Sequence, residues 1–307
     1  MFILLLLKEV LILKKQIMHD NLIILAGGMS SRMKQPASSN NISKEQEKEA
    51  NQRSKSLISV GNEGRPLLDY LLYNAKKAGY QNIFIVINEQ GKLFHDFYGH
   101  QKSGNLFNGL TISFAIQFIP KNRMKPFGTA DAVYQTLEQY PKLKKEQFTV
   151  CNSDNLYSIL ALKSLRETQK SNAFISYNRD ALDFSIHKIL SFAIVNLNDK
   201  NYLQSIIEKP SLEEAEKYKD EDGKIRVSMN IFKLDGNKIY TYLKQCPVHP
   251  IRNEKELPTA ILNMIHQSDT SLLGIPFSEH VPDLTAKDDI AIIKTFLEKQ
   301  YPKELIW

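Results

Sequence analysis

The chain is predicted to be an α/β protein with a mostly parallel sheet and helices on both faces. Residues 22–25 form an apolar run, which is typical of a buried strand inside such a sheet. Predicted strands and amphipathic helices then alternate up to residue 177, and each strand–helix–strand unit implies a right-handed crossover. From residue 192 the pattern changes to strands joined by short turns, which predicts a β-rich insertion.

The element boundaries follow from apolar periodicity and from Gly and Pro at the ends of segments. Strands are expected at residues 22–25, 82–87, 110–118, 147–151, 173–177, 192–197, 202–208, 227–234 and 271–276. Helices are expected between Pro66 and Gly79, around residues 130–137, and at 159–168, 237–245, 258–266 and 286–300. The strands at 192–197, 202–208 and 227–234 are expected to form an antiparallel subdomain beside the functional site. No linker divides the chain, so we expect a single domain over residues 18–307.

The composition is that of an ordinary globular protein, with 42% hydrophobic and 24% charged residues among 307. The formal charge is +6, but Lys and Arg are interleaved with Asp and Glu, which favours a generic basic surface or a site for phosphorylated substrates over nucleic-acid binding. Cys151 and Cys246 are too few and too far apart for a disulfide framework, and no His cluster near them suggests zinc. We therefore expect a protein of the reducing cytoplasm.

The first 17 residues differ from the rest of the chain. Residues 1–13 are apolar apart from Lys8 and Glu9, which is too short and too interrupted for a membrane span. No small-residue cleavage site precedes the first strand, and a second methionine, Met18, stands just before it. We hypothesise that residues 1–17 are an N-terminal extension from an upstream start codon, or else a weak interfacial helix.

The loop after the first strand carries a pattern suited to phosphate. Gly27 and Gly28 end the strand, and Ser30, Ser31 and Arg32 follow. Glycines bring backbone N–H groups close to a bound anion, and the Arg supplies charge for phosphate oxygens. The alternative is an ordinary strand–turn–helix connection with surface cations. The spacing matches neither a Walker A loop nor a dinucleotide fingerprint.

Residues 35–54 are almost entirely polar, so we expect a mobile loop or lid there, with a neutral surface insertion as the alternative. Structure is expected to resume at Lys55. Two further loops follow predicted strands: one places Gly128 and Thr129 at a helix N-terminus, and one places Asp154 at a strand end. Ligands of open α/β sheets bind at such carboxyl ends. Asp154 suits Mg²⁺, or caps the next helix, or does both.

Six segments appear in a meaningful order along the chain. They are 25–33 (LAGGMSSRM), Lys55, 125–132 (KPFGTADA), Ser153-Asp154, 207–210 (IEKP) and 281–285 (VPDLT). Together they resemble the sugar-1-phosphate nucleotidylyltransferases, or NDP-sugar pyrophosphorylases, of the nucleotidyltransferase family, and their cytidylyl- and guanylyltransferase relatives. The resemblance runs from Asn21 to the final helix. It implies a Rossmann-like, GT-A-like fold with a β-rich sugar-binding insertion.

The resemblance also implies an activity and roles for particular residues. The implied reaction is the Mg²⁺-dependent conversion of a nucleoside triphosphate and a sugar 1-phosphate into an NDP-sugar and pyrophosphate, in residues 18–180 (nucleotide half, with loop 35–54) and 181–307 (sugar-phosphate half). The implied catalytic residues are Arg32 and Lys55, and the implied metal ligands are Asp154 and Asp283. Nucleotide contacts would come from Ala26, Gly27, Gly28, Ser30, Ser31, Gly128 and Thr129, and sugar-phosphate contacts from Glu208 and Lys209. Neither nucleic acid nor a membrane span is expected, and a homo-oligomer is left open.

Several positions depart from the sugar enzymes. Ser30 replaces a glycine, Ser31 replaces a threonine, and Asn230 stands where glycine is usual. The Ser-Ser version is closer to nucleotidyltransferases of cofactor synthesis, which is one alternative. A non-catalytic sensor of nucleotide or sugar phosphate is another. The β-rich segment that carries Glu208 favours a sugar acceptor.

Overall fold

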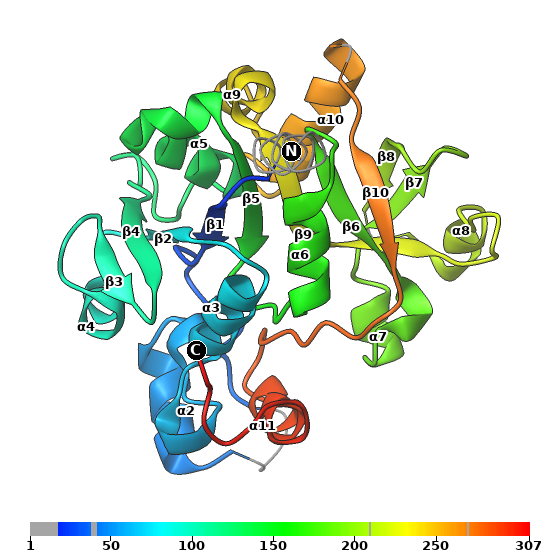
Figure 1. Ribbon diagram of the computed structural model, residues 1–307. Coiled ribbons are helices and arrows are strands. Elements are labelled where there is room, and N and C mark those ends of the chain that lie inside the picture. Colours follow the sequence, from blue (N-terminus) through cyan, green and yellow to red (C-terminus); the bar gives the residue numbers. More distant parts are fainter. Residues whose placement is uncertain (1–17, 38–41, 209, 269) are drawn as a thin grey trace, which may run out of the picture.

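The computed structural model describes residues 18–37, 42–208, 210–268 and 270–307. The proposed extension, residues 1–17, lies outside them. The strands make one sheet of ten, in which the order along the main path is β10-β6-β9-β5-β1-β2-β4-β3 (Figure 1). Their bounds are β1 (Asn21–Leu25), β2 (Asn82–Ile87), β3 (Asn105–Phe107), β4 (Leu110–Ile116), β5 (Gln147–Asn152), β6 (Ala173–Asn178), β7 (Ile194–Leu197), β8 (Leu203–Ile207), β9 (Arg226–Asp235) and β10 (Leu273–Phe277).

The centre of the sheet is parallel, as predicted. β1 pairs in parallel with β2 on one side and with β5 on the other, and β2 pairs in parallel with β4. β6 and β10 form another parallel pair. Antiparallel pairs join β9 to both β5 and β6, and β3 to β4. This mixed but mostly parallel arrangement confirms the predicted α/β class.

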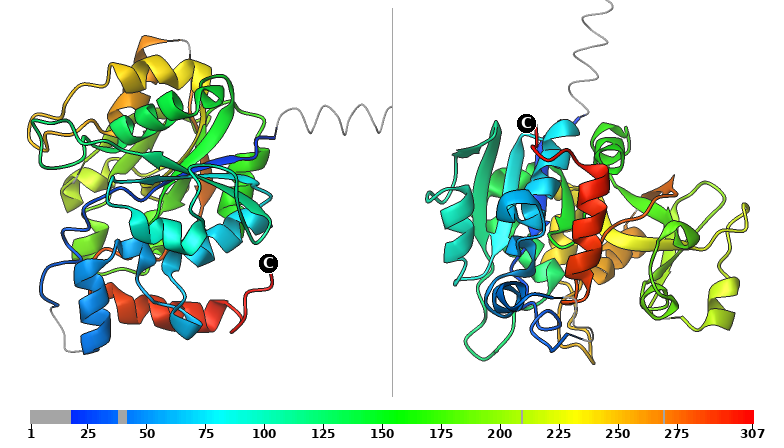
Figure 2. Two further views of the ribbon diagram at one scale, coloured as in Figure 1. Left: turned by 90° about the vertical axis from the view of Figure 1, so that its left-hand side faces the viewer. Right: turned by 90° about the horizontal axis from the view of Figure 1, so that it is seen from below.

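Helices cover both faces of the sheet (Figures 1 and 2). Their bounds are α2 (Lys44–Gln52), α3 (Leu67–Lys77), α4 (Lys92–Tyr98), α5 (Thr129–Gln139), α6 (Ile159–Glu167), α7 (Ile186–Ile189), α8 (Leu212–Glu216), α9 (Gly236–Lys244), α10 (Leu257–Gln267) and α11 (Asp289–Gln300). No helix among the described residues is long and apolar enough to cross a membrane.

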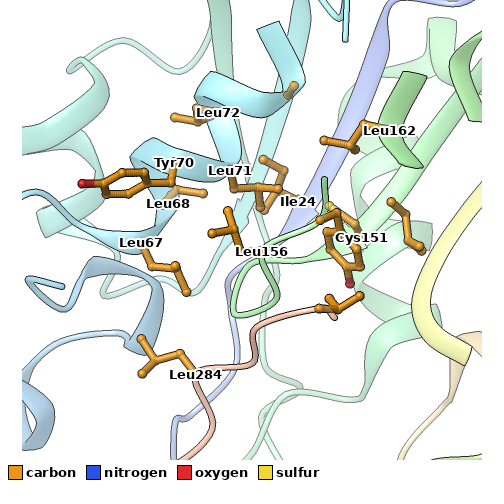
Figure 3. Close-up of a cluster of buried hydrophobic side chains, with 14 of the residues drawn as sticks. Ile24, Leu67, Leu68, Tyr70, Leu71, Leu72, Cys151, Leu156, Leu162 and Leu284 are labelled. Atoms are coloured by element: carbon orange, nitrogen blue, oxygen red, sulfur yellow. The ribbon is translucent and has the colours of Figure 1, made fainter. Parts of the chain in front are cut away.

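The apolar run in β1 shows how the two layers arise. Successive side chains of a strand point to opposite faces. Leu22 and Ile24 therefore enter one hydrophobic cluster, with side chains from α3, α6 and α11 (Figure 3). Ile23 enters the other cluster, with α5, α9 and α10. All three side chains are fully buried, so β1 anchors both layers and fixes where its loop emerges.

One prediction about the β-rich part needs correction. β7 and β8 form the expected antiparallel hairpin, but β9 is part of the main sheet between β5 and β6. β9 is ten residues long and is buried on both faces, with Ile231 and Phe232 fully enclosed, which suits the interior of a sheet rather than an insertion. β7 is joined to β9 through the pair of Ile194 and Val227.

The predicted loop over residues 35–54 contains a helix in its second half. Residues 44–52 form α2, which begins in a capping box: the Ser43 side chain accepts from the Gln46 N–H, and the Gln46 side chain accepts from the Ser43 N–H. The Glu49 carboxylate accepts from the Ser59 N–H at 3.0 Å, and Ala50 is fully buried. Local capping and these two anchors order a segment with few apolar residues. Residues 38–41 of the predicted loop lie outside the described ranges.

Smaller differences concern short elements. Lys55–Leu57 is a 3₁₀ turn, and Pro66 is the N-cap of α3 rather than its first helical residue. The sequence patterns did not indicate β3, α4 or α8, which are three to seven residues long and too short for clear periodicity.

Candidate active site

Three of the predicted loops meet at one cavity of about 390 Å³. They are the loop after β1, the segment before α5 and the loop after β5. The strands β1 and β5 are parallel neighbours, so their carboxyl ends open at the same edge of the sheet. The predicted residues that line the cavity are Ala26, Gly27, Gly28, Ser30, Ser31, Arg32, Lys55, Gly128, Thr129 and Asp154.

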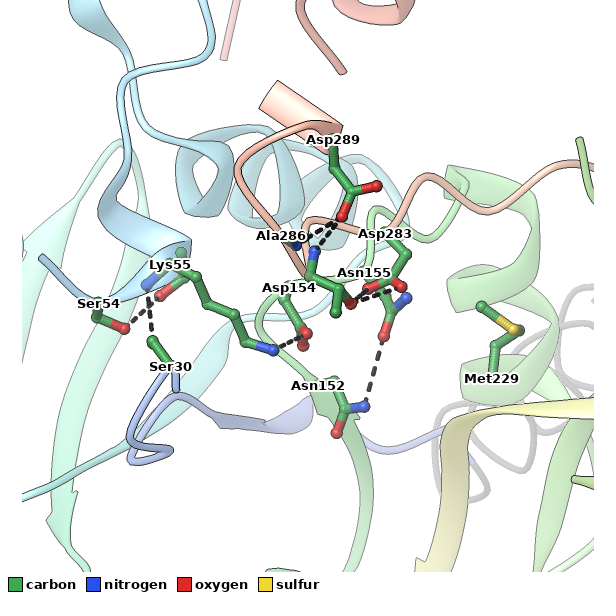
Figure 4. Close-up of polar contacts among 12 residues, drawn as sticks. Ser30, Ser54, Lys55, Asn152, Asp154, Asn155, Met229, Asp283, Ala286 and Asp289 are labelled. Carbon is green, nitrogen blue, oxygen red and sulfur yellow. Dashed lines mark hydrogen bonds and ion pairs between the residues drawn. The ribbon is translucent and has the colours of Figure 1, made fainter. Parts of the chain in front are cut away.

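The loop after β1 turns sharply at the cavity wall. The Ala26 N–H donates to the Val86 carbonyl at 2.8 Å and so ends the strand against β2. Ser30 has φ +53°, in the left-handed region that favours glycine. Its hydroxyl accepts from the Lys55 N–H at 3.2 Å (Figure 4). The serine thus ties this loop to the segment that carries Lys55.

The basic residues Arg32 and Lys55 line the cavity together with the backbone of Gly28. Arg32 is exposed and contributes to the lining, so its guanidinium can meet an incoming phosphate. Gly28 has no heavy atom within 4 Å of the position where a Cβ would stand, which leaves the backbone approachable. Met33, two residues further than Ser31, is fully buried and anchors the loop from behind.

Lys55 and Asp154 form an ion pair across the cavity floor (Figure 4). Burial raises the pKa of the Asp154 carboxyl above its ordinary value; Lys55 opposes that shift and Asp283 adds to it. The Ser153 N–H donates to the Leu25 carbonyl at 3.2 Å, which fixes the loop after β5 to the end of β1. A buried carboxylate beside a second one favours a bound cation.

Asp283 is brought to Asp154 by the backbone. Asn155 and Asp283 form an isolated antiparallel bridge, and the Leu284 N–H donates to the Asp154 carbonyl at 2.8 Å. The Thr285 hydroxyl lies 2.8 and 2.7 Å from the two carboxylate oxygens of Asp283. The structure therefore places side by side two carboxylates that are 129 positions apart in the printed numbering, 154 and 283.

This pair fits a hard divalent cation. Mg²⁺ is held in proteins by one or two carboxylates, with substrate phosphates and waters as its other ligands. The described residues contain no group of three or more His, Cys, Asp or Glu side chains that could hold a metal alone. Asp154 and Asp283, both about 90% buried, provide the oxygen donors for a shared site of this kind.

Gly128 and Thr129 are positioned by the loop that follows α9. Gly128 has φ +100°, and a Cβ there would stand 2.4 Å from the Lys255 carbonyl oxygen. The Lys255 N–H donates to the Phe127 carbonyl at 2.7 Å, and the Ala130 N–H donates to the Lys255 carbonyl at 2.9 Å. The Thr129 hydroxyl accepts from the Leu257 N–H. Both residues line the cavity, but the hydroxyl of Thr129 also holds α10 in place.

Two described residues of the predicted site do not line this cavity. Asp283 borders a second cavity, of about 680 Å³, instead. Glu208 lines neither cavity. Its carboxylate pairs with Arg252 at 3.0 Å, and Arg252 also pairs with Glu256. The side chain of Glu208 is 44% exposed. Its neighbour Lys209 lies outside the described residues.

Sequence reasoning missed several residues around the cavity. Gln117 lines it directly after β4, and its amide donates to the Gly128 carbonyl and to Asp131 at 3.0 Å each. The rule that ligands bind at strand ends could have identified Gln117. Glu254 lines the cavity from the loop after α9, and Lys188 pairs with Asp283 at 3.0 Å. No sequence signal distinguishes Glu254 or Lys188 from other charged residues.

The fold and this cavity are those of an α/β protein whose ligand site lies at the carboxyl ends of parallel strands. Comparison with known proteins gives the family: residues 21–272 match the model of the nucleotidyl transferase family, and the chain belongs to that family. This membership confirms the family predicted from the sequence motifs.

Individual relatives agree with that assignment. The chain is 28% identical over 193 residues to glucose-1-phosphate adenylyltransferase 1 of Vibrio vulnificus, covering 61% of this chain and 42% of the relative. It is 22% identical over 237 residues to the glucose-1-phosphate adenylyltransferase of Rhodopseudomonas palustris, covering 76% and 51%. The matches thus span about half of these relatives or less.

A solved structure has the same fold. The crystal structure of a UDP-glucose pyrophosphorylase complexed with UDP-glucose matches with a TM-score of 0.65 at 14% identity, over 92% of this chain and 100% of that one. The predicted GT-A-like nucleotidyltransferase fold is therefore confirmed.

Proposed function

We propose that the chain is a Mg²⁺-dependent sugar-1-phosphate nucleotidylyltransferase. It would convert a nucleoside triphosphate and a sugar 1-phosphate into an NDP-sugar and pyrophosphate. The observation that carries the proposal is the cavity lined by Arg32, Lys55 and Asp154, with Asp283 bridged to Asn155, the residue after Asp154. The named activities of the relatives, which act on glucose 1-phosphate and UDP-glucose, make glucose 1-phosphate the first acceptor to test.

The reaction sets the demands on the site. An oxygen of the acceptor phosphate attacks the α-phosphorus of the triphosphate, and the bond from that phosphorus to the bridging oxygen breaks, which releases pyrophosphate. Both reactants are anions, so the protein has to supply positive charge and in-line positioning rather than a covalent nucleophile. A divalent metal, when bound, neutralises phosphate oxygens and orients them.

The residues of the chain have separate tasks in this proposal. The backbone of Gly27 and Gly28 approaches the triphosphate, and Arg32 offsets the charge that develops at the α-phosphate. Asp154 and Asp283 would hold the metal, and the Lys55 ammonium would then be free to neutralise a phosphate oxygen. Residues 18–180 would hold the nucleotide. Residues 181–307 would hold the acceptor, with Glu208, just after β8, and Lys209, which follows it in the sequence, as the proposed contacts. These substrates are cytoplasmic metabolites, so we place the reaction in the cytoplasm.

Detection of the product tests the proposal. Purified protein is incubated with each of the four common nucleoside triphosphates, or dTTP, and a panel of sugar 1-phosphates with Mg²⁺, and NDP-sugars are sought by mass spectrometry. We expect one preferred pair that gives stoichiometric pyrophosphate. A folded protein that yields no NDP-sugar from any pair contradicts the proposal.

A cofactor-type cytidylyl- or guanylyltransferase is the second candidate, because the Ser30-Ser31 pair in the loop after β1 resembles that class. The Ser30 hydroxyl also accepts a hydrogen bond from the Lys55 N–H, so the serine is part of the loop's structure. Alcohol phosphates and a pterin phosphate in the same panel separate the two, since turnover of those acceptors but not of sugar 1-phosphates would favour it. A non-catalytic sensor would instead bind nucleotide saturably without product.

A further inference from the structure

One lysine beside the metal carboxylates has no role in the reaction described above. Lys188 is on α7, in the acceptor half of the chain, and its ammonium lies 3.0 Å from Asp283 Oδ2 and 3.2 Å from Asp289 Oδ1. It also donates to the Asp283 carbonyl at 3.3 Å. Lys188 thus pairs with Asp283, a member of the proposed metal pair, and with Asp289, six positions further along the chain.

Asp283 does not need Lys188 for its orientation. The Thr285 hydroxyl contacts both carboxylate oxygens of Asp283, and the backbone bridge to Asn155 fixes the position of its main chain. What Lys188 adds is therefore chiefly charge. An ammonium in contact with a carboxylate competes with any other cation for the same oxygen.

Asp289 offers Lys188 a second partner that stays in place. Asp289 Oδ2 accepts from the N–H groups of Thr285 at 2.8 Å and Ala286 at 2.7 Å (Figure 4). Its Oδ1 accepts from the Lys188 ammonium at 3.2 Å. The ammonium also lies 4.5 Å from the centre of the Phe184 ring and borders a cavity of about 680 Å³. Lys188 can therefore leave Asp283 without losing all its partners.

We propose that Lys188 is a resident counter-ion that competes with the divalent metal for Asp283 and remains on Asp289 once the metal has taken Asp283. The inference rests on the proposed function, because it takes Asp154 and Asp283 as the metal pair. Lys55 stands in the same relation to Asp154 on the other side. In the metal-free protein each carboxylate is paired with a lysine, so the metal binds weakly until the phosphates of the nucleotide add their own oxygens.

The test measures Mn²⁺ binding to the protein without any nucleotide, from the electron paramagnetic resonance signal of free Mn²⁺. Lys188→Met removes the competing charge, and we expect it to bind Mn²⁺ about fivefold or more tightly than the wild type. Lys188→Arg keeps the charge and is expected to stay within about twofold of the wild type. Lys299→Met is the matched control: Lys299 borders the same cavity, is exposed and makes no ion pair among the described residues.

A second variant acts in the opposite direction. Asp289→Asn retains an oxygen for the Thr285 and Ala286 amides but weakens the alternative partner of Lys188, so Mn²⁺ should bind more weakly than to the wild type. Asp289→Asn therefore still tests the competition between Lys188 and the metal if Lys188→Met fails to fold. Lys299→Met should match the wild type, because Lys299 does not contact Asp283.

The outcomes separate this inference from the proposed function. Equal or weaker Mn²⁺ binding by Lys188→Met, an equal gain in Lys299→Met, or no bound Mn²⁺ in any variant overturns the inference, even if the wild type forms an NDP-sugar. The expected pattern of Mn²⁺ binding in a protein that forms no NDP-sugar supports the inference and leaves the proposed reaction contradicted.

Discussion

At the scale of single residues, Gly128 connects one wall of the cavity to the loop after α9. Its φ of +100° and its approach to the Lys255 carbonyl leave no room for a side chain. Gly104 has φ +78° but no heavy atom within 4 Å of a Cβ, so it isolates the cost of the left-handed backbone from that of the clash. The pair allows the role of close packing at this wall to be measured.

We expect Gly128→Ala to lower the free energy of unfolding by about 1–3 kcal/mol more than Gly104→Ala does. The clash should also displace the wall, so the KM for nucleoside triphosphate should rise in Gly128→Ala only. Denaturant unfolding and steady-state kinetics of the two variants check both effects. Equal losses in the two variants would show that the Lys255 contact is unimportant.

Most of the candidate site could be predicted at this scale because each residue type has a limited chemistry. Glycines after a buried strand, Asp154 at a strand end and Lys55 beyond the variable segment all reached the cavity as predicted. Lys188 could not be foreseen, because its pairing with Asp283 depends on how α7 packs. Glu208 was assigned to the sugar by its motif, and its pairing with Arg252 depends on a loop 44 positions away.

At the scale of elements, α2 supports the segment that carries Lys55, the lysine proposed to be catalytic. The helix begins at the capping box of Ser43 and Gln46, and its Glu49 holds the Ser59 backbone just beyond Lys55. α2 and α11 lie side by side in two views, and Glu47 pairs with Lys287 at 3.7 Å (Figures 1 and 2). The stability of α2 is therefore coupled to the position of Lys55 and of the segment that carries Asp283.

Ser43→Ala should lower the stability of α2 by about 1 kcal/mol, because an N-cap side chain is lost. We expect faster amide hydrogen exchange over residues 44–52 and a higher KM for nucleoside triphosphate. Ser211→Ala removes the equivalent cap of α8, whose side chain accepts from the Glu214 N–H far from the cavity lining. An equal rise in KM in both variants would contradict a specific role for α2.

The strands were more predictable than the polar segments. β1, β2, β5 and β6 have long apolar runs whose burial on both faces requires the sheet interior. β9 has the same property, but its order in the sheet is set by pairing with β5 and β6 and cannot be read from neighbouring sequence. α2 depends on caps and on two tertiary contacts, which periodicity does not report.

At the scale of the whole molecule, the sheet assembles the site from distant segments. The order β2-β1-β5 places the loops after β1 and β5 together, and the bridge between Asn155 and Asp283 adds a segment from near the end of the chain. At the opposite end of β1, His19 is buried next to Thr149 and Tyr80. Its environment makes the stability of the fold depend on pH.

Burial and the nearby charge of Lys233 lower the pKa of His19 from 6.5 to about 3. The unfolded chain takes up a proton at His19 near pH 6.5, whereas in the folded protein the His19 ring stays neutral until the pH approaches 3. The contribution of His19 to the free energy of unfolding is therefore complete above pH 6.5 and is lost as the pH falls toward the folded pKa. Between pH 7 and pH 5 the expected loss is about 2 kcal/mol.

Denaturant unfolding at several pH values checks this expectation. His19→Gln should lose that part of the pH dependence, whatever its absolute stability. His266→Gln, which changes an exposed histidine, should retain it. An identical slope for the wild type and His19→Gln would rule out His19 as the cause.

The most direct test of the central claim is Mg²⁺-dependent pyrophosphate release by the wild type and by Asp154→Asn, with the preferred triphosphate and glucose 1-phosphate or the acceptor found in the panel. We expect release by the wild type only when both substrates are present. The variant should keep the same fold by circular dichroism and should lose at least about 10²-fold in kcat/KM, because one of the two metal carboxylates is gone. Equal pyrophosphate release by the two proteins would contradict the assignment of this cavity as the active site.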